Sequence, residues 1–383
     1  MNKCFILLLL VFTSYLSQAQ VKDSLKPAKS VQADLPKVQD SLKATTDSLH
    51  TDTVKSKELI EEERMKTFYN EGTKLLQEKK YKEAIINFDS ALNIRPAFAK
   101  AYYNRATAWL EQKKYQEAIN DFTTTIELEP DNANAYFNRG LIYYEQKDEK
   151  NALYDFTKTI EKDSKNAEAF FYRGFYRFGM KQYAGAIEDY NKAIDLKPDY
   201  VYALNDRASA KQMLNDITGA LADYTSASLI NPKLPYVWNS IGSMQSLLKN
   251  FQAAITAYDK AVKTDKDYYI AFNNRGIAKL ESGDIKGAID DFSAAINIKN
   301  DYAFAYNNRA NAKYKLEDYK GAVEDYNKAI EIQPNYAEAY LNRAISKEML
   351  RDETGMCEDW KKAAELGIKS AENYYNNQCL NNE

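Results

Sequence analysis

Histidine, cysteine and glycine are scarce in this chain of 383 residues, which has one histidine, three cysteines and 13 glycines. A single histidine, His50, cannot supply a Ser/His/Asp or Cys/His set for nucleophilic catalysis, nor a histidine-based metal site. No glycine-rich phosphate-binding loop occurs either. The sequence therefore predicts a protein that is not an enzyme and that holds no metal or other cofactor. An enzymatic alternative would have to rely on carboxylates alone or on a partner's active site.

Excess charge of one sign and long apolar runs are also missing. The chain has 52 basic and 55 acidic residues, a net charge of -3, and no basic stripe that could neutralise a run of phosphates. The longest apolar run, residues 5–16, is shorter than the ~20 residues that a membrane-spanning helix needs. We therefore expect no nucleic-acid partner and no integral membrane segment in the mature chain.

The N-terminus has the features of an export signal. Met1-Asn2-Lys3 precedes the apolar run, and small residues stand one and three places before a cleavage point after Ala19. This pattern predicts a signal peptide over residues 1–19 and hence a periplasmic or secreted protein. Cys4 lies before the apolar run, so lipid anchoring is disfavoured.

Residues 20–60 are rich in Lys, Asp, Ser and Thr and include no aromatic residue. Such a composition cannot build a core, so we expect a disordered linker. Four triplets of an acid, a hydroxyl residue and an apolar residue resemble the acceptor motif of a bacterial periplasmic O-glycosylation system. The resemblance marks as acceptors Ser24, Ser41, Ser48 and Thr53. A merely solvated tether of low complexity is the alternative.

A small residue recurs every 34 positions from residue 65 onward, without gap or insertion. The column consists of Gly72, Ala106, Gly140, Gly174, Ala208, Gly242, Gly276, Ala310 and Ala344. Twelve positions later stands an alanine, with Met356 the one departure, and sixteen positions later an aromatic residue. Five units then close at Pro96, Pro130, Pro198, Pro232 and Pro334, and proline stops a helix. Each unit should be two antiparallel amphipathic helices that approach closely at the small residues.

An aromatic residue also stands four positions before the small residue in every unit except that of Leu204. With this column, the pattern resembles the tetratricopeptide repeat. The resemblance implies an all-α, right-handed α-solenoid superhelix of nine helical hairpins, with a C-terminal capping helix in residues 371–383. The 34-residue units are 65–98, 99–132, 133–166, 167–200, 201–234, 235–268, 269–302, 303–336 and 337–370. One departure is that the family's tyrosine, three places after the small residue, is replaced by Lys211, Lys279, Lys313 and Lys347.

Arginine precedes the small residue in seven units, and an aspartate follows each arginine by sixteen positions. A row of arginines could form an anion-binding groove. However, the two columns change together: where arginine is replaced by Glu71 or Ile241, the aspartate becomes Asn87 or Ala257. Structural ion pairs within each hairpin are therefore the favoured interpretation, although such pairs specify geometry more than they add stability.

Asparagine is the most frequent residue one position before this arginine column. In the family this position faces the concave inner surface, and the row resembles the asparagine ladder with which some helical solenoids hold an extended peptide backbone. An amide suits that role because it both donates and accepts hydrogen bonds. The resemblance marks as peptide-binding residues Asn70, Asn104, Asn138, Asn274, Asn308 and Asn342. The alternative is that they merely cap a polar, solvated face.

Aromatic residues crowd the first helices of the third and fourth units. Positions that the family turns toward its concave face hold Phe137, Leu141, Tyr144, Phe171, Tyr172, Phe175 and Phe178. An exposed apolar patch there would mark an interaction site and anchor a ligand. Burial by neighbouring units is the competing explanation.

Two cysteines, Cys357 and Cys379, remain after signal removal. An even pair in an oxidising compartment predicts a disulfide, with two unpaired thiols as the alternative. The segment 357–367 resembles the closing unit of bacterial repeat proteins, after which a short helix covers the exposed end.

The sequence as a whole predicts a non-catalytic scaffold that acts outside the cytoplasm through its concave groove. The expected partner is a protein or an extended peptide. The alternative is a homo-oligomer, or a fixed structural subunit of a cell-envelope assembly.

Overall fold

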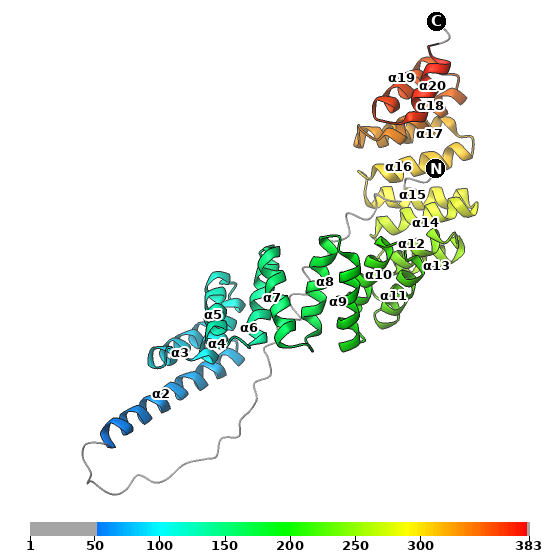
Figure 1. Ribbon diagram of the computed structural model, residues 1–383. Helices are drawn as coiled ribbons and strands as arrows, with labels where there is room; N and C mark the ends of the chain where they lie inside the picture. The colour runs from blue at the N-terminus through cyan, green and yellow to red at the C-terminus, as the bar shows by residue number, and fades with distance from the viewer. Residues whose placement is uncertain (1–51, 381–383) are drawn as a thin grey trace. The chain divides into compact units, whose positions relative to one another are not determined.

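The computed structural model describes residues 52–380. All secondary structure in this range is helical, in nineteen helices from α2 to α20 (Figure 1). The all-α prediction is therefore confirmed. The expected signal peptide, the linker up to residue 51, His50 and the acceptor candidates Ser24, Ser41 and Ser48 lie outside the described residues, whereas Thr53 lies in the first turn of α2.

The chain divides into two compact units after Tyr176, which lies within α8. The first unit contains α2 (Asp52–Gln77), α3 (Tyr81–Ile94), α4 (Ala99–Glu111), α5 (Tyr115–Leu128), α6 (Ala133–Glu145), α7 (Glu149–Lys162) and most of α8 (Ala167–Gly179). The second contains α9 (Tyr183–Leu196), α10 (Val201–Met213), α11 (Ile217–Ile230), α12 (Pro235–Leu247), α13 (Phe251–Thr264), α14 (Tyr269–Ser282), α15 (Ile285–Ile298), α16 (Ala303–Lys315), α17 (Tyr319–Ile332), α18 (Ala337–Met349), α19 (Glu353–Glu365) and α20 (Lys369–Gln378). Within each unit, hairpins of two helices follow one another, as in a solenoid (Figure 1).

Helix α2 starts earlier than the sequence suggests. It begins at Asp52, so the last nine residues of the segment that we expected to be a linker are helical. This part contains two lysines and a glutamate and leads directly into three glutamates at residues 61–63, and Lys and Glu are good helix formers. It continues the helix of the first hairpin outward (Figure 1). Its apolar residues Leu59 and Ile60 are exposed, so propensity and not burial explains the extension.

The small and aromatic columns meet inside the hairpins. A Cβ atom added to Gly242 would lie 2.6 Å from Cε1 of Tyr258, and one added to Gly276 would lie 2.7 Å from Cε1 of Phe292. Only glycine allows so close an approach without moving the ring. The rings themselves are at most 3 % exposed in all nine units. Each hairpin is therefore closed by a ring of its second helix against the backbone of its first.

The turn inside each hairpin contains a residue in the left-handed conformation. These positions hold Lys79, Lys113, Lys147, Lys181, Asn215, Lys249, Gly283, Glu317 and Arg351. The next backbone N–H donates to the carbonyl five residues earlier, as from Lys114 to Trp109 at 2.9 Å. This is the bond of a Schellman C-cap. Only one of the nine turns uses glycine, so glycine content gave no sign of them.

The second helices end in the same register with and without proline. Pro96 and Pro334 follow helix ends at Ile94 and Ile332, while α7 and α15 end at Lys162 and Ile298 with no proline after them. In each case the residue after the helix is extended and its N–H still closes the last helical turn. The junctions without proline are thus as regular as the others.

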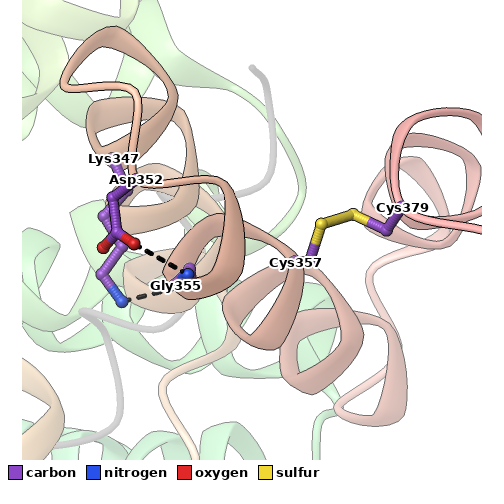
Figure 2. Close-up of a disulfide and its surroundings, with 5 residues drawn as sticks. All are labelled: Lys347, Asp352, Gly355, Cys357 and Cys379. Carbon is purple, nitrogen blue, oxygen red and sulfur yellow. Dashed lines mark hydrogen bonds between the residues drawn. A yellow bond between two sulfur atoms is a disulfide. The ribbon is translucent and has the colours of Figure 1, made fainter. Parts of the chain in front are cut away.

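The C-terminal helix α20 is tied down covalently. A disulfide joins Cys357 of α19 to Cys379, with 5.8 Å between the two Cα atoms (Figure 2), so the predicted pairing is present. Trp360, Met356 and Ala371 form a buried cluster beneath the bridge. Closing a loop of 22 residues stabilises a fold by about 3 kcal/mol in the chain-entropy model. The end of the second unit is thereby capped.

Candidate functional site

Six arginines of the recurring column each hold the aspartate of their own hairpin with two hydrogen bonds. Arg139 donates from Nε and Nη2 to the two carboxylate oxygens of Asp155, each at 2.8 Å. The same bidentate geometry joins Arg105–Asp121, Arg207–Asp223, Arg275–Asp291, Arg309–Asp325 and Arg343–Asp359. The structural ion-pair interpretation is confirmed for these six hairpins.

The third nitrogen of the guanidinium reaches back to the preceding hairpin. Nη1 of Arg139 donates to Oγ1 of Thr123, sixteen residues earlier, at 2.9 Å. The corresponding acceptors for the other five arginines are Asp89, Asn191, Asp259, Ser293 and Asn327. Five of these arginines, all except Arg207, also lie over an aromatic ring of their own helix, as Arg275 does over Phe272 at 5.3 Å, in a cation–π contact. One side chain thus joins three helices.

These contacts direct all three nitrogens of the guanidinium to partners inside the repeat. Asp155 is 0 % exposed; burial raises the pKa of its carboxyl, and the hydrogen bonds and charge of Arg139 oppose that rise. A buried carboxylate needs such a partner, because an unpaired buried charge is costly. The anion-binding alternative therefore has no support in the six hairpins with resolved pairs.

A second cation joins the aspartate where the family's tyrosine is replaced. Nζ of Lys347 lies 2.9 Å from Oδ2 of Asp359. It also donates to the carbonyl oxygen of Gly355 at 3.2 Å (Figure 2). The same contacts occur for Lys279 and Lys313. Every unit with Lys or Arg in this column has glycine eight positions later, and no other unit does. This covariation was visible in the sequence, and our sequence analysis missed it.

The asparagines of the predicted ladder connect successive hairpins. Nδ2 of Asn104 donates to the Tyr69 hydroxyl at 3.1 Å, and Nδ2 of Asn138 donates to the Tyr103 hydroxyl at 2.9 Å. Asn70, in the first hairpin, is exposed. The predicted asparagines after the first therefore do more than cap a solvated face, because each binds the first helix of the preceding hairpin. We call the side of the first helices that carries them the ladder face.

In the second unit the ladder becomes a relay of asparagines. Asn308 donates to Asn273 at 3.0 Å, Asn273 to Asn274 at 3.4 Å, and Asn274 to Asn239 at 3.0 Å. Asn273 is 0 % exposed. Further along, Asn342 donates to Asn311 at 3.2 Å. The residues Asn239 and Asn273 stand where the first unit has Tyr69, Tyr103 and Phe137, and the sequence analysis did not single them out.

The aromatic patch is largely internal. Phe137, Leu141, Phe171 and Tyr172 are at most 9 % exposed. Tyr172 stacks on the buried ring of Phe156 with 4.9 Å between the ring centroids. For these four side chains the structure favours the explanation by burial over that of an open ligand anchor.

Three members of the patch keep part of their surface accessible. These are Tyr144 and Phe175 in the first unit and Phe178 in the second. Tyr144 and Phe175 lie edge to face, with 5.6 Å between their ring centroids. Phe178 contacts Tyr183. Only these three could meet a ligand without rearrangement of the core.

No cluster of three or more metal-ligating side chains occurs among residues 52–380. Within the same range, no helix is both long enough and apolar enough to cross a bilayer. The predicted binding residues on the first helices are mostly amides and aromatic rings, which are groups that bind a polypeptide by hydrogen bonding and packing.

Sequence models of one repeat family match the chain in most of its length. Models described as tetratricopeptide repeat match residues 69–122, 134–166, 167–200, 248–303 and 303–336, and one described as TPR repeat matches residues 108–147. Together the matched stretches cover more than half of the chain. No curated protein matches it.

Several solved structures are similar in fold. A tetratricopeptide repeat protein from Parabacteroides merdae is 18 % identical, with a TM-score of 0.51 over 64 % of this chain and 97 % of that one. The Cut9–Hcn1 hetero-tetramer of APC/C gives 16 % identity and a TM-score of 0.50, over 78 % of this chain and 59 % of that one. YrrB, described as a TPR protein with an unusual peptide-binding site, gives 21 % identity and a TM-score of 0.43, over 48 % and 95 %. At these identities the first two likenesses show the fold alone.

Replacing Asn273 tests the relay. Asn273→Ala removes the amide that donates to Asn274 and accepts from Asn308. The free energy of unfolding should therefore fall by about 1–3 kcal/mol in urea titrations. The matched control is Asn70→Ala, at an exposed position of the same face, which should change it by less than about 0.5 kcal/mol. Equal effects of the two substitutions would contradict the relay.

Proposed function

Because the chain belongs to the tetratricopeptide repeat family, whose members are protein-interaction scaffolds, we propose that it binds an extended peptide or a protein helix on the ladder face. The tetratricopeptide repeat fold, which residues 52–380 adopt, generally serves as a non-catalytic protein-binding scaffold. The observation that carries this proposal is the arrangement of the ladder amides. One N–H of each bridging asparagine is fixed to the preceding hairpin, which orients the remaining amide groups.

These amides are arranged for a peptide backbone. Asn104, Asn138, Asn308 and Asn342 each use an N–H toward the preceding hairpin, while their carbonyl oxygens take no part in those bonds. An oriented carbonyl can accept from a backbone N–H without first losing rotamer freedom, and preorganisation of this kind lowers the entropic cost of binding. The hydrogen bonds that join each asparagine to the preceding hairpin thus prepare its carbonyl oxygen for binding a peptide.

Tyr144 and Phe175 supply the apolar contact in this proposal. They are partly exposed side chains held edge to face above a buried aromatic cluster. Rigid aromatic side chains lose little entropy on binding and are frequent binding hot spots. The anchor is thus smaller than the seven-residue patch that the sequence suggested.

The proposed setting is outside the cytoplasm. It is supported by the signal-like N-terminus, by the acid–hydroxyl–apolar triplets around Ser24, Ser41, Ser48 and Thr53, and by a disulfide, since structural disulfides persist in oxidising compartments. Residues 20–51 would then act as a tether that is glycosylated at Ser24, Ser41 and Ser48, with Thr53 as a further acceptor at the start of α2.

Self-association is the second candidate, and one observation favours it. The turns within the hairpins of the second unit carry exposed apolar side chains: Met180, Met213, Leu214, Leu247, Leu248, Leu316, Met349 and Leu350. The corresponding turns of the first unit hold Glu and Gln. An exposed apolar stripe can be covered by a second copy.

Photo-crosslinking in intact cells tests the binding surface. With Phe175→p-benzoylphenylalanine, we expect a covalent adduct with another protein, because the probe replaces an aromatic side chain on the proposed binding face. The control is Tyr154→p-benzoylphenylalanine, an aromatic position on α7 that is 53 % exposed, which should give no such adduct. Absence of an adduct at Phe175, or the same adduct at both positions, would refute this surface. An adduct between two copies of the chain would favour self-association.

The proposed setting predicts the covalent state of the mature protein. Intact-mass spectrometry without reductant should find a chain that begins at Gln20 and lacks two hydrogen atoms, because the signal is removed and Cys357 is bonded to Cys379. Glycosylation would add discrete mass to residues 20–60. A chain that retains Met1, with both thiols free, would exclude export to an oxidising compartment.

A further inference from the structure

One acid interrupts the asparagine column in the second unit. Asp206 of α10 stands in the 34-residue register where α14 has Asn274 and α16 has Asn308. Its carboxylate accepts one hydrogen bond, from Nδ2 of Asn205 at 3.0 Å. Asn205 belongs to the column that forms the buried relay and is 7 % exposed. Asp206 therefore places a carboxylate on the ladder face at a position that holds an uncharged side chain in the other eight hairpins.

This carboxylate forms no salt bridge with any residue that the structure describes, and the cations nearest to it along the helix are engaged elsewhere. Arg207 holds Asp223 with two hydrogen bonds and Asn191 with a third. Nζ of Lys211 lies 2.7 Å from the same Asp223. Burial raises the pKa of Asp206 to about 6, against the lowering effect of Asn205. Among residues 52–380, Asp206 thus has no cation paired with it, which is unfavourable for a partly buried carboxylate.

Tyrosines surround the carboxylate. Tyr202 stands one helical turn before Asp206 on the same face of α10. The Tyr236 hydroxyl of α12 is buried and has no hydrogen-bond partner, and the charge of Asp206 contributes to raising the Tyr236 pKa, after burial and the nearby Tyr202. The Tyr224 hydroxyl is already bonded to Ser209 at 3.0 Å. An environment of uncharged aromatic rings around one carboxylate is favourable for binding an organic cation.

We infer that Asp206, with Tyr202 and Tyr236, is a specificity site that receives a lysine or arginine side chain of the bound polypeptide. The inference rests on the proposed function of the ladder face. The ammonium or guanidinium donates charge-assisted hydrogen bonds to the Asp206 carboxylate. The tyrosine rings contact the cation and the alkyl stem. The polypeptide thereby supplies the positive charge that the site lacks.

Selection from a display library of random 12-residue peptides, with the mature full-length chain as target, tests this inference. Selected peptides should share lysine or arginine at one fixed position. In fluorescence anisotropy, Asp206→Asn should weaken their binding at least tenfold. Replacing that lysine by norleucine, or that arginine by citrulline, should weaken binding to the wild type equally but leave binding to the Asp206→Asn variant unchanged.

Controls separate this effect from charge loss and from misfolding. Asp195→Asn removes the same charge from an exposed position on α9 and should leave affinity within twofold. If Asp206→Asn loses its helical circular dichroism, Asp206→Ser replaces it, since Ser240 occupies the same place in the next hairpin. Selected peptides without a shared basic residue, or equal affinity for wild type and variant, would overturn the inference and leave the proposed function standing. If no peptide is selected, the proposed function itself fails.

Discussion

The arginine that precedes the small residue of a hairpin is the interaction on which the repeat depends. Its guanidinium holds a buried aspartate of the same hairpin, an acceptor of the preceding hairpin and the face of an aromatic ring. A planar group with donors in fixed directions can make these contacts at once, and a lysine cannot. The burial of apolar side chains favours a compact chain, but because it is non-directional it does not fix which residues of two helices lie opposite one another. The arginine contacts fix both the closure of a hairpin and its stacking on the one before.

Most of the fold followed from the sequence because its determinants are local and recur every 34 residues. Glycine or alanine, the aromatic ring and the Arg/Asp columns predicted the hairpins, and the structure joins them as expected. The start of α2 at Asp52 was missed, because a polar composition was taken as a sign of disorder although its residues favour helix. The left-handed turn residues were also missed, since lysine occupies most of them and nothing in its chemistry marks that conformation.

The candidate site was less predictable because it depends on contacts between units. The asparagine row was visible, yet only coordinates show that Asn138 donates to Tyr103 or that Asn273 joins a buried relay. Periodicity assigned the apolar residues at 137, 141, 171 and 172 to one side of their helices, but it cannot tell how much of a face the neighbouring hairpin covers, and all four are buried. The acceptors sixteen residues before each arginine, and the pairing of Lys347 with Gly355, could have been found by comparing columns two at a time.

The most direct test of the central claim uses a combination that the chain already contains, Ile241 with Ala257. Arg139→Ile and the double change Arg139→Ile with Asp155→Ala should be compared by hydrogen exchange of the amides in α6 and α7. The single change leaves Asp155 buried without a cation, so the opening free energy should fall by about 3–5 kcal/mol. The double change should recover most of that loss. A double variant that is no more stable than the single one would contradict the claim that the arginine and the aspartate stabilise the hairpin as a pair.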